Sequence, residues 1–189
     1  MSSTQKIVYA IAFQIGWFVC ILTGNLASSC YVAIFLVVHL WQVTRQNPAL
    51  LNKEIIWVAV VSVFGIVVET LAFSTGCLYL QAGDNLTARE NIFEYFLLPP
   101  LWLLNLWLIF AIALRSCLSF LLCRPQLLYS LSLILIPINY YAGAALNDSV
   151  ELNHPYVFSL SLITLFWLVF FWCIMHIKRR HFEDMFNAR

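Results

Sequence analysis

Long apolar stretches recur along the chain and are separated by short polar segments. A helix needs about 20 mostly apolar residues to cross about 30 Å of hydrocarbon. Six stretches approach or reach this length, at residues 7–22, 26–44, 55–80, 99–122, 127–146 and 156–177. The pattern therefore predicts an all-α membrane protein, with six transmembrane helices forming one bundle and one domain over residues 1–189.

Composition supports a membrane protein and narrows the expected partners. Hydrophobic residues make up 62% of the chain and charged residues 10%, and the mean hydropathy is +0.86. A soluble domain of this length could not bury so much apolar surface. The net charge of +1 gives no support for nucleic-acid binding, so the phospholipid bilayer is the expected partner. The six cysteines lack the paired spacing of a metal or redox site, and we expect neither a metal nor a cofactor.

Lysine and arginine gather in alternate connecting segments. If the N-terminus is cytoplasmic, the inner segments hold eight of these residues and the outer segments hold only Arg89. Because cytoplasmic loops carry the excess of basic residues, this distribution predicts that both termini are cytoplasmic. Residues 178–189 then form a short basic cytoplasmic tail, for which phospholipid headgroups are the expected contact.

Glu69 and Arg115 are the ionisable residues deepest in the predicted helices. A charge at a helix centre costs about 2.5 to 3.5 kcal/mol on insertion scales, so such residues usually face the bundle interior. Small residues at helical spacing share one face with Glu69, and they are Ser62, Gly65, Ala72 and Gly76. Because small residues let helices approach closely in lipid, this face is predicted to be the packed one, and Glu69 to point inward.

The depths of the two residues allow them to pair. A rise of 1.5 Å per residue places Glu69 about 21 Å and Arg115 about 13 Å above the cytoplasmic ends of their helices. The difference of about 8 Å is near the combined reach of two long side chains. One hypothesis is therefore an ion pair between them. Alternatively, Arg115 extends along its own helix to the headgroups while Glu69 stays neutral, or Arg115 has another partner.

Three uncharged or weakly basic residues lie at similar depth, namely Gln14, His39 and Asn139. Asn139 follows Pro137, whose missing N–H frees a backbone carbonyl and could open a small cavity. These residues could join Glu69 and Arg115 in an intramembrane polar site. The simpler interpretation is that each one hydrogen-bonds across helices and contributes only about 0.6 kcal/mol to packing.

Four segments carry a resemblance to a known family. They are FQIGWF at 13–18, ETLAFSTG from Glu69, PPLWLLNLWLIFA at 99–111 and PINYYAGA at 137–144. Over about residues 13–146 the chain is similar to a family of small proteobacterial inner-membrane proteins with a domain of unknown function. The resemblance implies a multi-pass protein of the bacterial inner membrane with no assigned activity. It also implies a lipid-linked role, because lipid-modifying enzymes are encoded near members of the family.

Glu69 has an acidic counterpart in the family, so the resemblance supports Glu69 as a site residue more strongly than Arg115. The family's fourth span carries small polar residues or histidine where this chain has RSC at 115–117.

Three functions are compatible with these observations. The favoured one is a protein accessory to membrane-lipid metabolism, with a lipid or a lipid-modifying enzyme as its partner. The second is a transporter of a small solute or proton that uses Glu69 beside a proline-interrupted helix. The third is a membrane-embedded lipid-modifying enzyme, with Glu69 as acid or base and Arg115 on an anionic headgroup. The sequence contains no catalytic motif that decides whether the protein is an enzyme.

Overall fold

The computed structural model describes residues 2–80, 99–147 and 149–187, and most of them are helical. The helices are α1 (Ser3–Gln46), α2 (Leu51–Ser74), α3 (Leu101–Arg115), α4 (Pro125–Leu146), α5 (Tyr156–Ile177) and α6 (Glu183–Asn187). Short 3-10 turns occupy Pro48–Leu50 and Leu121–Cys123, and a π-helical turn occupies Lys178–Phe182. The all-α prediction is confirmed, apart from two short strands, β1 (Leu78–Leu80) and β2 (Val150–Leu152).

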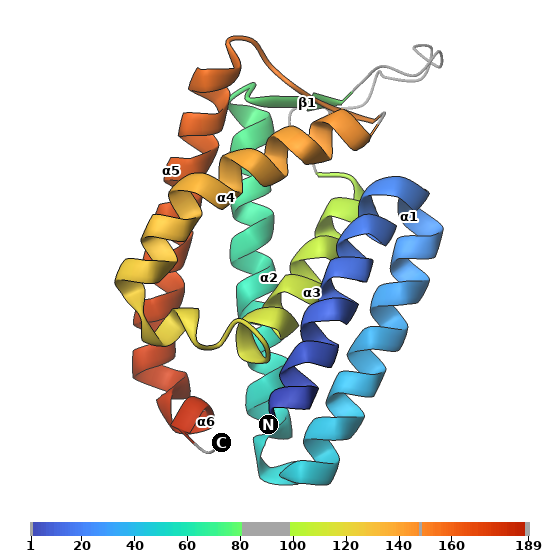
Figure 1. Ribbon diagram of the computed structural model, residues 1–189, viewed down its shortest axis with the longest axis vertical. Helices are drawn as coiled ribbons and strands as arrows, with labels where there is room; N and C mark the ends of the chain where they lie inside the picture. The colour runs from blue at the N-terminus through green and yellow to red at the C-terminus, as the bar shows by residue number, and fades with distance from the viewer. Residues whose placement is uncertain (1, 81–98, 148, 188–189) are drawn as a thin grey trace, which may run out of the picture.

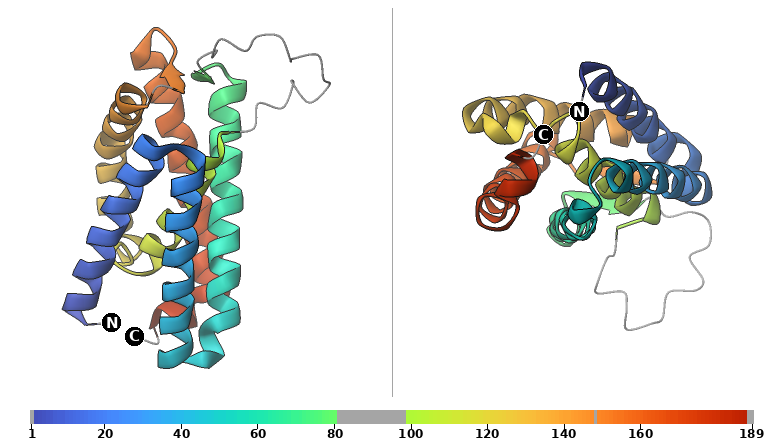
Figure 2. Two further views of the ribbon diagram at one scale, coloured as in Figure 1. Left: turned by 90° about the vertical axis from the view of Figure 1, so that its right-hand side faces the viewer. Right: turned by 90° about the horizontal axis from the view of Figure 1, so that it is seen from below.

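Helix α1 folds back on itself at Gly24. This glycine has φ 74° and ψ −166°, a conformation that residues with a Cβ rarely adopt. The two arms of α1 therefore lie side by side (Figure 2). The Tyr31 hydroxyl joins them by donating to the Ala12 carbonyl at 2.6 Å. The break falls where the hydrophobic pattern separates residues 7–22 from residues 26–44.

The described helices are those of a multi-pass membrane protein. Among the described residues, four helical segments are long and apolar enough to cross a membrane: Ser3–Gln46, Pro48–Ser74, Pro125–Leu146 and Tyr156–Phe186. Helix α3 has only 15 residues and lies among the others, packed against α1 and α2 (Figure 1). Its Ile109, Ala111 and Ile112 are fully buried, so α3 forms the centre of the core.

Two predicted helices end earlier than the sequence pattern suggests. The helix predicted over 99–122 ends at Arg115, because Ser116 leaves helical geometry and the chain turns until α4 begins. The helix predicted over 55–80 ends at Ser74, because Gly76 adopts φ 72° and the next residues form β1. Strand β1 pairs antiparallel with β2, with Tyr79 opposite Glu151.

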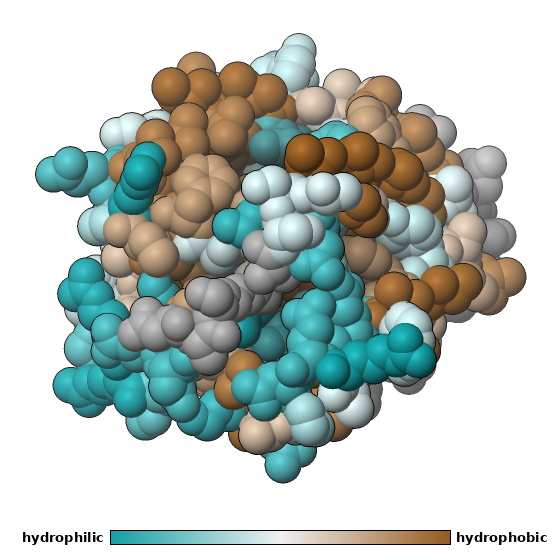
Figure 3. Space-filling model, turned by 60° about the horizontal axis from the view of Figure 1, so that its bottom comes forward, coloured by the Kyte–Doolittle hydropathy of each residue, from teal (hydrophilic) through white to brown (hydrophobic). Residues whose placement is uncertain are grey.

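The first and last described residues lie at the same end of the molecule, and the two strands lie at the opposite end (Figure 1). Hydrophilic residues gather over much of the end that carries the termini (Figure 3). Two of the basic residues that entered the prediction of orientation, Arg89 and Arg189, lie outside the described residues.

The tail predicted over residues 178–189 packs against the bundle through its apolar residues, while Arg179, Arg180 and His181 are exposed. It folds back beneath the helices, where Phe182 is buried and Met185 is fully buried. The indole ring of Trp57 makes edge contacts with Phe182 and with Phe186, at centroid distances of 5.4 and 5.1 Å. The apolar residues between the basic ones therefore make the tail part of the core at this end.

Candidate functional site

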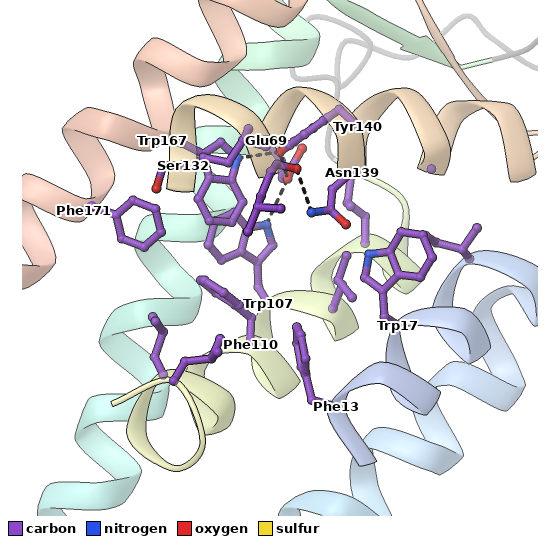
Figure 4. A pocket seen from close by; sticks show the side chains of 18 of the residues that line it. Phe13, Trp17, Glu69, Trp107, Phe110, Ser132, Asn139, Tyr140, Trp167 and Phe171 are labelled. Atoms are coloured by element: carbon purple, nitrogen blue, oxygen red, sulfur yellow. Dashed lines mark hydrogen bonds between the residues drawn. The ribbon is translucent and has the colours of Figure 1, made fainter. Parts of the chain in front are cut away.

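Glu69 lies inside the bundle, as the seam of small residues predicts. Only 2% of its surface is exposed. The indole N–H of Trp107 donates to Glu69 Oε1 at 3.1 Å, and the Tyr140 hydroxyl donates to the same oxygen at 2.5 Å. The indole N–H of Trp167 in turn donates to the Tyr140 oxygen at 2.9 Å (Figure 4). Helices α2, α3, α4 and α5 thus each contribute one residue to this network.

Gly65 explains how Trp107 reaches Glu69. A Cβ added at Gly65 would lie 2.0 Å from Cδ2 of the Trp107 indole. Real atoms do not approach so closely, so only glycine leaves space for the ring on this face of α2. The Trp107 ring is held on its other side by Trp167, which stacks on it with centroids 4.5 Å apart. The small-residue seam therefore accommodates an aromatic side chain at this point.

The second carboxylate oxygen of Glu69 differs from the first. Both hydrogen bonds converge on Oε1, and Oε2 is buried without a hydrogen-bond partner among the described residues. An unpaired buried carboxylate oxygen is unfavourable, and such groups in native proteins call for an explanation. Glu69 therefore retains one free position for a proton or a ligand.

A cavity of about 460 Å³ lies beside Glu69. Its walls come mainly from the first arm of α1 and from α3, α4 and α5, and they are mostly apolar. The aromatic lining residues include Phe13, Trp17, Trp107, Phe110, Tyr140 and Trp167. This combination of an apolar wall and few polar groups is typical of small-molecule sites.

Gln14 and Asn139 line the same cavity as Glu69, at its exposed edge between α1 and α4. The Asn139 amide donates to the Leu135 carbonyl of its own helix at 2.7 Å, so the prediction that it bonds across helices is wrong. Helix α4 continues through Pro137, so the proline does not break it. Three of the five candidate residues, Gln14, Glu69 and Asn139, therefore line the same cavity.

Arg115 and His39 belong to a different cluster. Arg115 Nε donates to Glu54 Oε2 at 3.2 Å, and His39 Nε2 lies 2.9 Å from Glu54 Oε1. All three side chains are at least 97% buried. The predicted pair of Arg115 with Glu69 is therefore wrong, and so is extension of Arg115 to the headgroups. The remaining alternative, another partner, is confirmed, and that partner is Glu54.

This cluster joins five parts of the chain. His39 Nδ1 lies 2.8 Å from the Tyr9 hydroxyl, which donates to Gln42 Oε1 at 2.8 Å. The Arg115 guanidinium donates through Nη2 to the Met185 carbonyl at 2.8 Å. The cluster therefore ties both arms of α1 to α2, α3 and the C-terminal tail. His39 does hydrogen-bond across helices, as the packing interpretation proposes.

Sequence analysis missed Glu54 because the predicted helix began at residue 55. A signal for it was present, because Glu54 precedes Gly65 by eleven residues, about three helical turns, and so lies on the same face of α2. Glu54 is fully buried. The two ends of one helix face thus carry one buried glutamate each.

The two glutamates have different surroundings. Glu54 has a basic residue on each oxygen and is part of a tightly packed junction. Glu69 has uncharged donors on one oxygen and a cavity nearby. Among the described residues, no group of three histidine, cysteine, aspartate or glutamate side chains is placed to hold a metal ion. Of these two glutamates, Glu69 is therefore the one with a carboxylate oxygen open to a ligand.

The helices and this site define a multi-pass membrane protein with a carboxyl group in an apolar cavity. The chain belongs to the DUF2878 family, described as proteins of unknown function, whose sequence model matches residues 6–173. Comparison with curated proteins and with solved structures gives no match. The matched range includes every lining residue of the cavity and ends before the tail that contacts Arg115.

Proposed function

We propose that this protein is a multi-pass protein of the bacterial inner membrane that binds a small lipophilic molecule from the bilayer. The observation that carries this proposal is the apolar cavity of about 460 Å³ beside the free oxygen of Glu69. Ligand cavities commonly have volumes of about 300 to 1,000 Å³ and combine apolar walls with a few placed polar groups.

Entry from the side fits the exposed edge of the cavity. Gln14, Leu135 and Asn139 line the cavity and are exposed. The neighbouring residues Leu133 and Ile134 of α4 are large, apolar and more than half exposed, as expected of a lipid-facing surface. A molecule dissolved in the bilayer could therefore pass between α1 and α4 without crossing water.

The proposed topology has six crossings with both termini in the cytoplasm. The two arms of α1 supply two crossings, and α2, α3, α4 and α5 supply the others. Both described ends of the chain lie at one end of the molecule, which an even number of crossings requires. Basic residues at 178–180 and at Arg45 and Lys53 lie toward the same end, in agreement with the positive-inside rule.

We expect reporter fusions to give this topology. A cytoplasm-active reporter joined after Arg189 should be active, and a periplasm-active reporter joined at the same place should be silent. The same pair inserted after Gly24 should give the opposite pattern, because Gly24 lies at the far end of the α1 hairpin. Periplasmic activity after Arg189 would overturn the orientation.

A membrane-dissolved ligand is compatible with a role accessory to membrane-lipid metabolism, whether the ligand is a lipid or a lipid-like compound. The alternative of an enzyme is weaker, because Arg115, its expected headgroup ligand, is paired with Glu54 and does not line the cavity. Transport remains the second candidate, favoured by the free oxygen of Glu69 in a cavity between helices. The transport hypothesis loses one of its two supports, the proline-interrupted helix, because α4 continues through Pro137.

A pair of substitutions at Gly143 tests binding in the cavity. Gly143 lines the cavity, and a Cβ there would make only ordinary contact, 3.7 Å from the Ile21 side chain. Gly143→Ala should therefore leave the cavity open, whereas Gly143→Phe should fill the space between α4 and α1. We expect a photoreactive long-chain alcohol to label residues of the cavity wall in the wild type and in Gly143→Ala.

In Gly143→Phe the probe should label the cavity wall about fivefold less or lower still, because the phenyl ring fills the space that the probe occupies. Mass spectrometry of peptides locates the labelled residues. Labelling of the lipid-facing residues Leu133 and Ile134 provides the internal control, because it should not change. Equal wall labelling in the two variants would show that the probe does not occupy the cavity.

A further inference from the structure

The cavity is lined by one carboxyl group, that of Glu69, and by no basic side chain among the described residues. Among the described residues that line it, Glu69 is the only aspartate, glutamate, lysine, arginine or histidine. Glu54 is the internal comparison, because Arg115 and His39 occupy its two oxygens. The chain therefore supplies counter-charges for one buried glutamate and supplies none, within its described part, for the other.

Burial leaves Glu69 two ways to be neutralised. An ionised carboxylate that is out of water and without a cation is strongly unfavourable. Either a proton occupies the free oxygen Oε2, or a positively charged group lies beside it. Trp107 and Tyr140 donate to Oε1 alone, so the position at Oε2 is open to either species.

The surroundings of Glu69 suit a cation better than an uncharged polar group. Aromatic faces attract cations, and tryptophan does so most strongly. The cavity is lined by the indoles of Trp17 and Trp167 and by the phenol of Tyr140 (Figure 4). The Trp107 ring lies between Gly65 and Trp167 and directs its N–H to Glu69. Aromatic rings with one carboxylate form a site that neutralises a positive charge and also buries its apolar substituents.

We propose that the ligand of this cavity is a lipophilic monovalent organic cation, which pairs with Glu69 in exchange for the glutamate's proton. The proposal rests on the proposed function, because it names the chemical class of the molecule that the cavity binds. In the exchange the O–H bond at Oε2 breaks, the proton leaves to water, and the cation takes its place beside the carboxylate. No electrons are transferred, and the net charge of the site stays zero.

Within the described part of the chain, the Tyr140 hydroxyl of α4 is the one other titratable group that contacts the Glu69 carboxyl. The residues that α1, α3 and α5 contribute to the cavity lining are aromatic, aliphatic or amide side chains. Exchange of a proton on binding is therefore assigned to Glu69, with Tyr140 remaining a donor to Oε1.

The test compares two ions of nearly equal size and opposite charge, tetraphenylphosphonium and tetraphenylborate. Isothermal titration of the detergent-solubilised full chain should show binding of the phosphonium and little or no binding of the borate. Repeating the phosphonium titration in buffers with different ionisation enthalpies should give on the order of one proton released per bound cation. Equal binding of both ions, or binding without proton release, would overturn the proposal.

Glu69→Gln should weaken phosphonium binding by about tenfold or more and abolish proton release, because the amide keeps the shape of the side chain and loses its charge. Glu151→Gln is the matched control, since Glu151 is a carboxylate in β2 outside the cavity. If Glu69→Gln does not fold, the wild-type comparison of the two ions still decides the question. Labelling of the cavity by the photoreactive alcohol without phosphonium binding would contradict the ligand class alone, whereas failure of both probes would contradict the proposed function as well.

Discussion

Arg115→Ala is expected to lower the free energy of unfolding by about 3 to 5 kcal/mol, because it leaves Oε2 of the buried Glu54 carboxylate without its cationic partner. The substitution also removes the hydrogen bond from Nη2 to the Met185 carbonyl and the contact of the guanidinium with the Phe186 ring, 4.9 Å away. The tail should therefore detach from the helices. Unfolding of the purified protein in mixed detergent, followed by circular dichroism, measures the first effect, and limited proteolysis of the tail measures the second.

A double-mutant cycle identifies the partner of Arg115. Glu54→Gln and Arg115→Gln should together cost at least about 1 kcal/mol less than the sum of the single substitutions, because the two side chains are in contact. The matched cycle pairs Arg115→Gln with Glu69→Gln and should show additive effects, since the two residues belong to separate clusters. Coupling in the second cycle and none in the first would restore the pair that the sequence suggested.

Gly65→Ala is expected to destabilise the protein by about 1 to 3 kcal/mol, since overpacking a close helix contact forces side chains or backbone to move. The added methyl group would coincide with the Trp107 indole, 2.0 Å from Cδ2. Trp107 should be displaced, and its hydrogen bond to Glu69 should be lost. A lower unfolding temperature and a shift in tryptophan fluorescence would report the two effects.

Gly143→Ala is the control for Gly65→Ala, and it is expected to stabilise the protein. Its Cβ has room, and replacing a helical glycine at an unstrained position stabilises proteins by about 0.4 to 1 kcal/mol. The difference between the two alanine variants therefore isolates the steric contact with Trp107. Equal stability of the Gly65 and Gly143 variants would contradict the close approach of α2 and α3.

The hydrophobic pattern was sufficient to predict an all-α protein with several helices apolar enough to cross a membrane, because a helix satisfies its own backbone polar groups in lipid. It also separated the two arms of α1 at the correct place, near Gly24. It did not predict where two helices end. The apolar character of residues 75–80 and 116–122 continues past Ser74 and Arg115, and hydropathy does not distinguish an apolar turn or strand from a helix.

The candidate site was predicted in part. Periodicity along one helix places Glu69 on the packed face, because that property depends only on the helix itself. The partner of Arg115 depends on which helices lie side by side. The depth of each residue along its own helix does not contain that information. The predicted depth of Arg115 assumed one straight helix over residues 99–122, whereas Arg115 is the last residue of α3 and lies next to the start of α2.

The tail shows a further limit of the sequence pattern. Its basic residues predict contact with headgroups, which stays a prediction, whereas the burial of Phe182 and Met185 against the bundle was not predicted. A run of five to ten mixed residues carries too little periodicity to indicate whether it docks on protein or on lipid. The Met185 backbone carbonyl accepts a hydrogen bond from Arg115. Because every residue has such a carbonyl, the type of residue 185 could not predict this contact.

The central claim is that Glu69 is open to a lipophilic molecule from the bilayer and that Glu54 is not. Dicyclohexylcarbodiimide, a lipid-soluble reagent that adds to carboxyl groups, tests it directly in membranes, with the modified residue located by mass spectrometry. We predict modification of Glu69, protection by tetraphenylphosphonium, a strong decrease in Gly143→Phe relative to Gly143→Ala, and an unmodified Glu54. Modification of Glu54 as fast as that of Glu69, or a Glu69 that does not react, would contradict it.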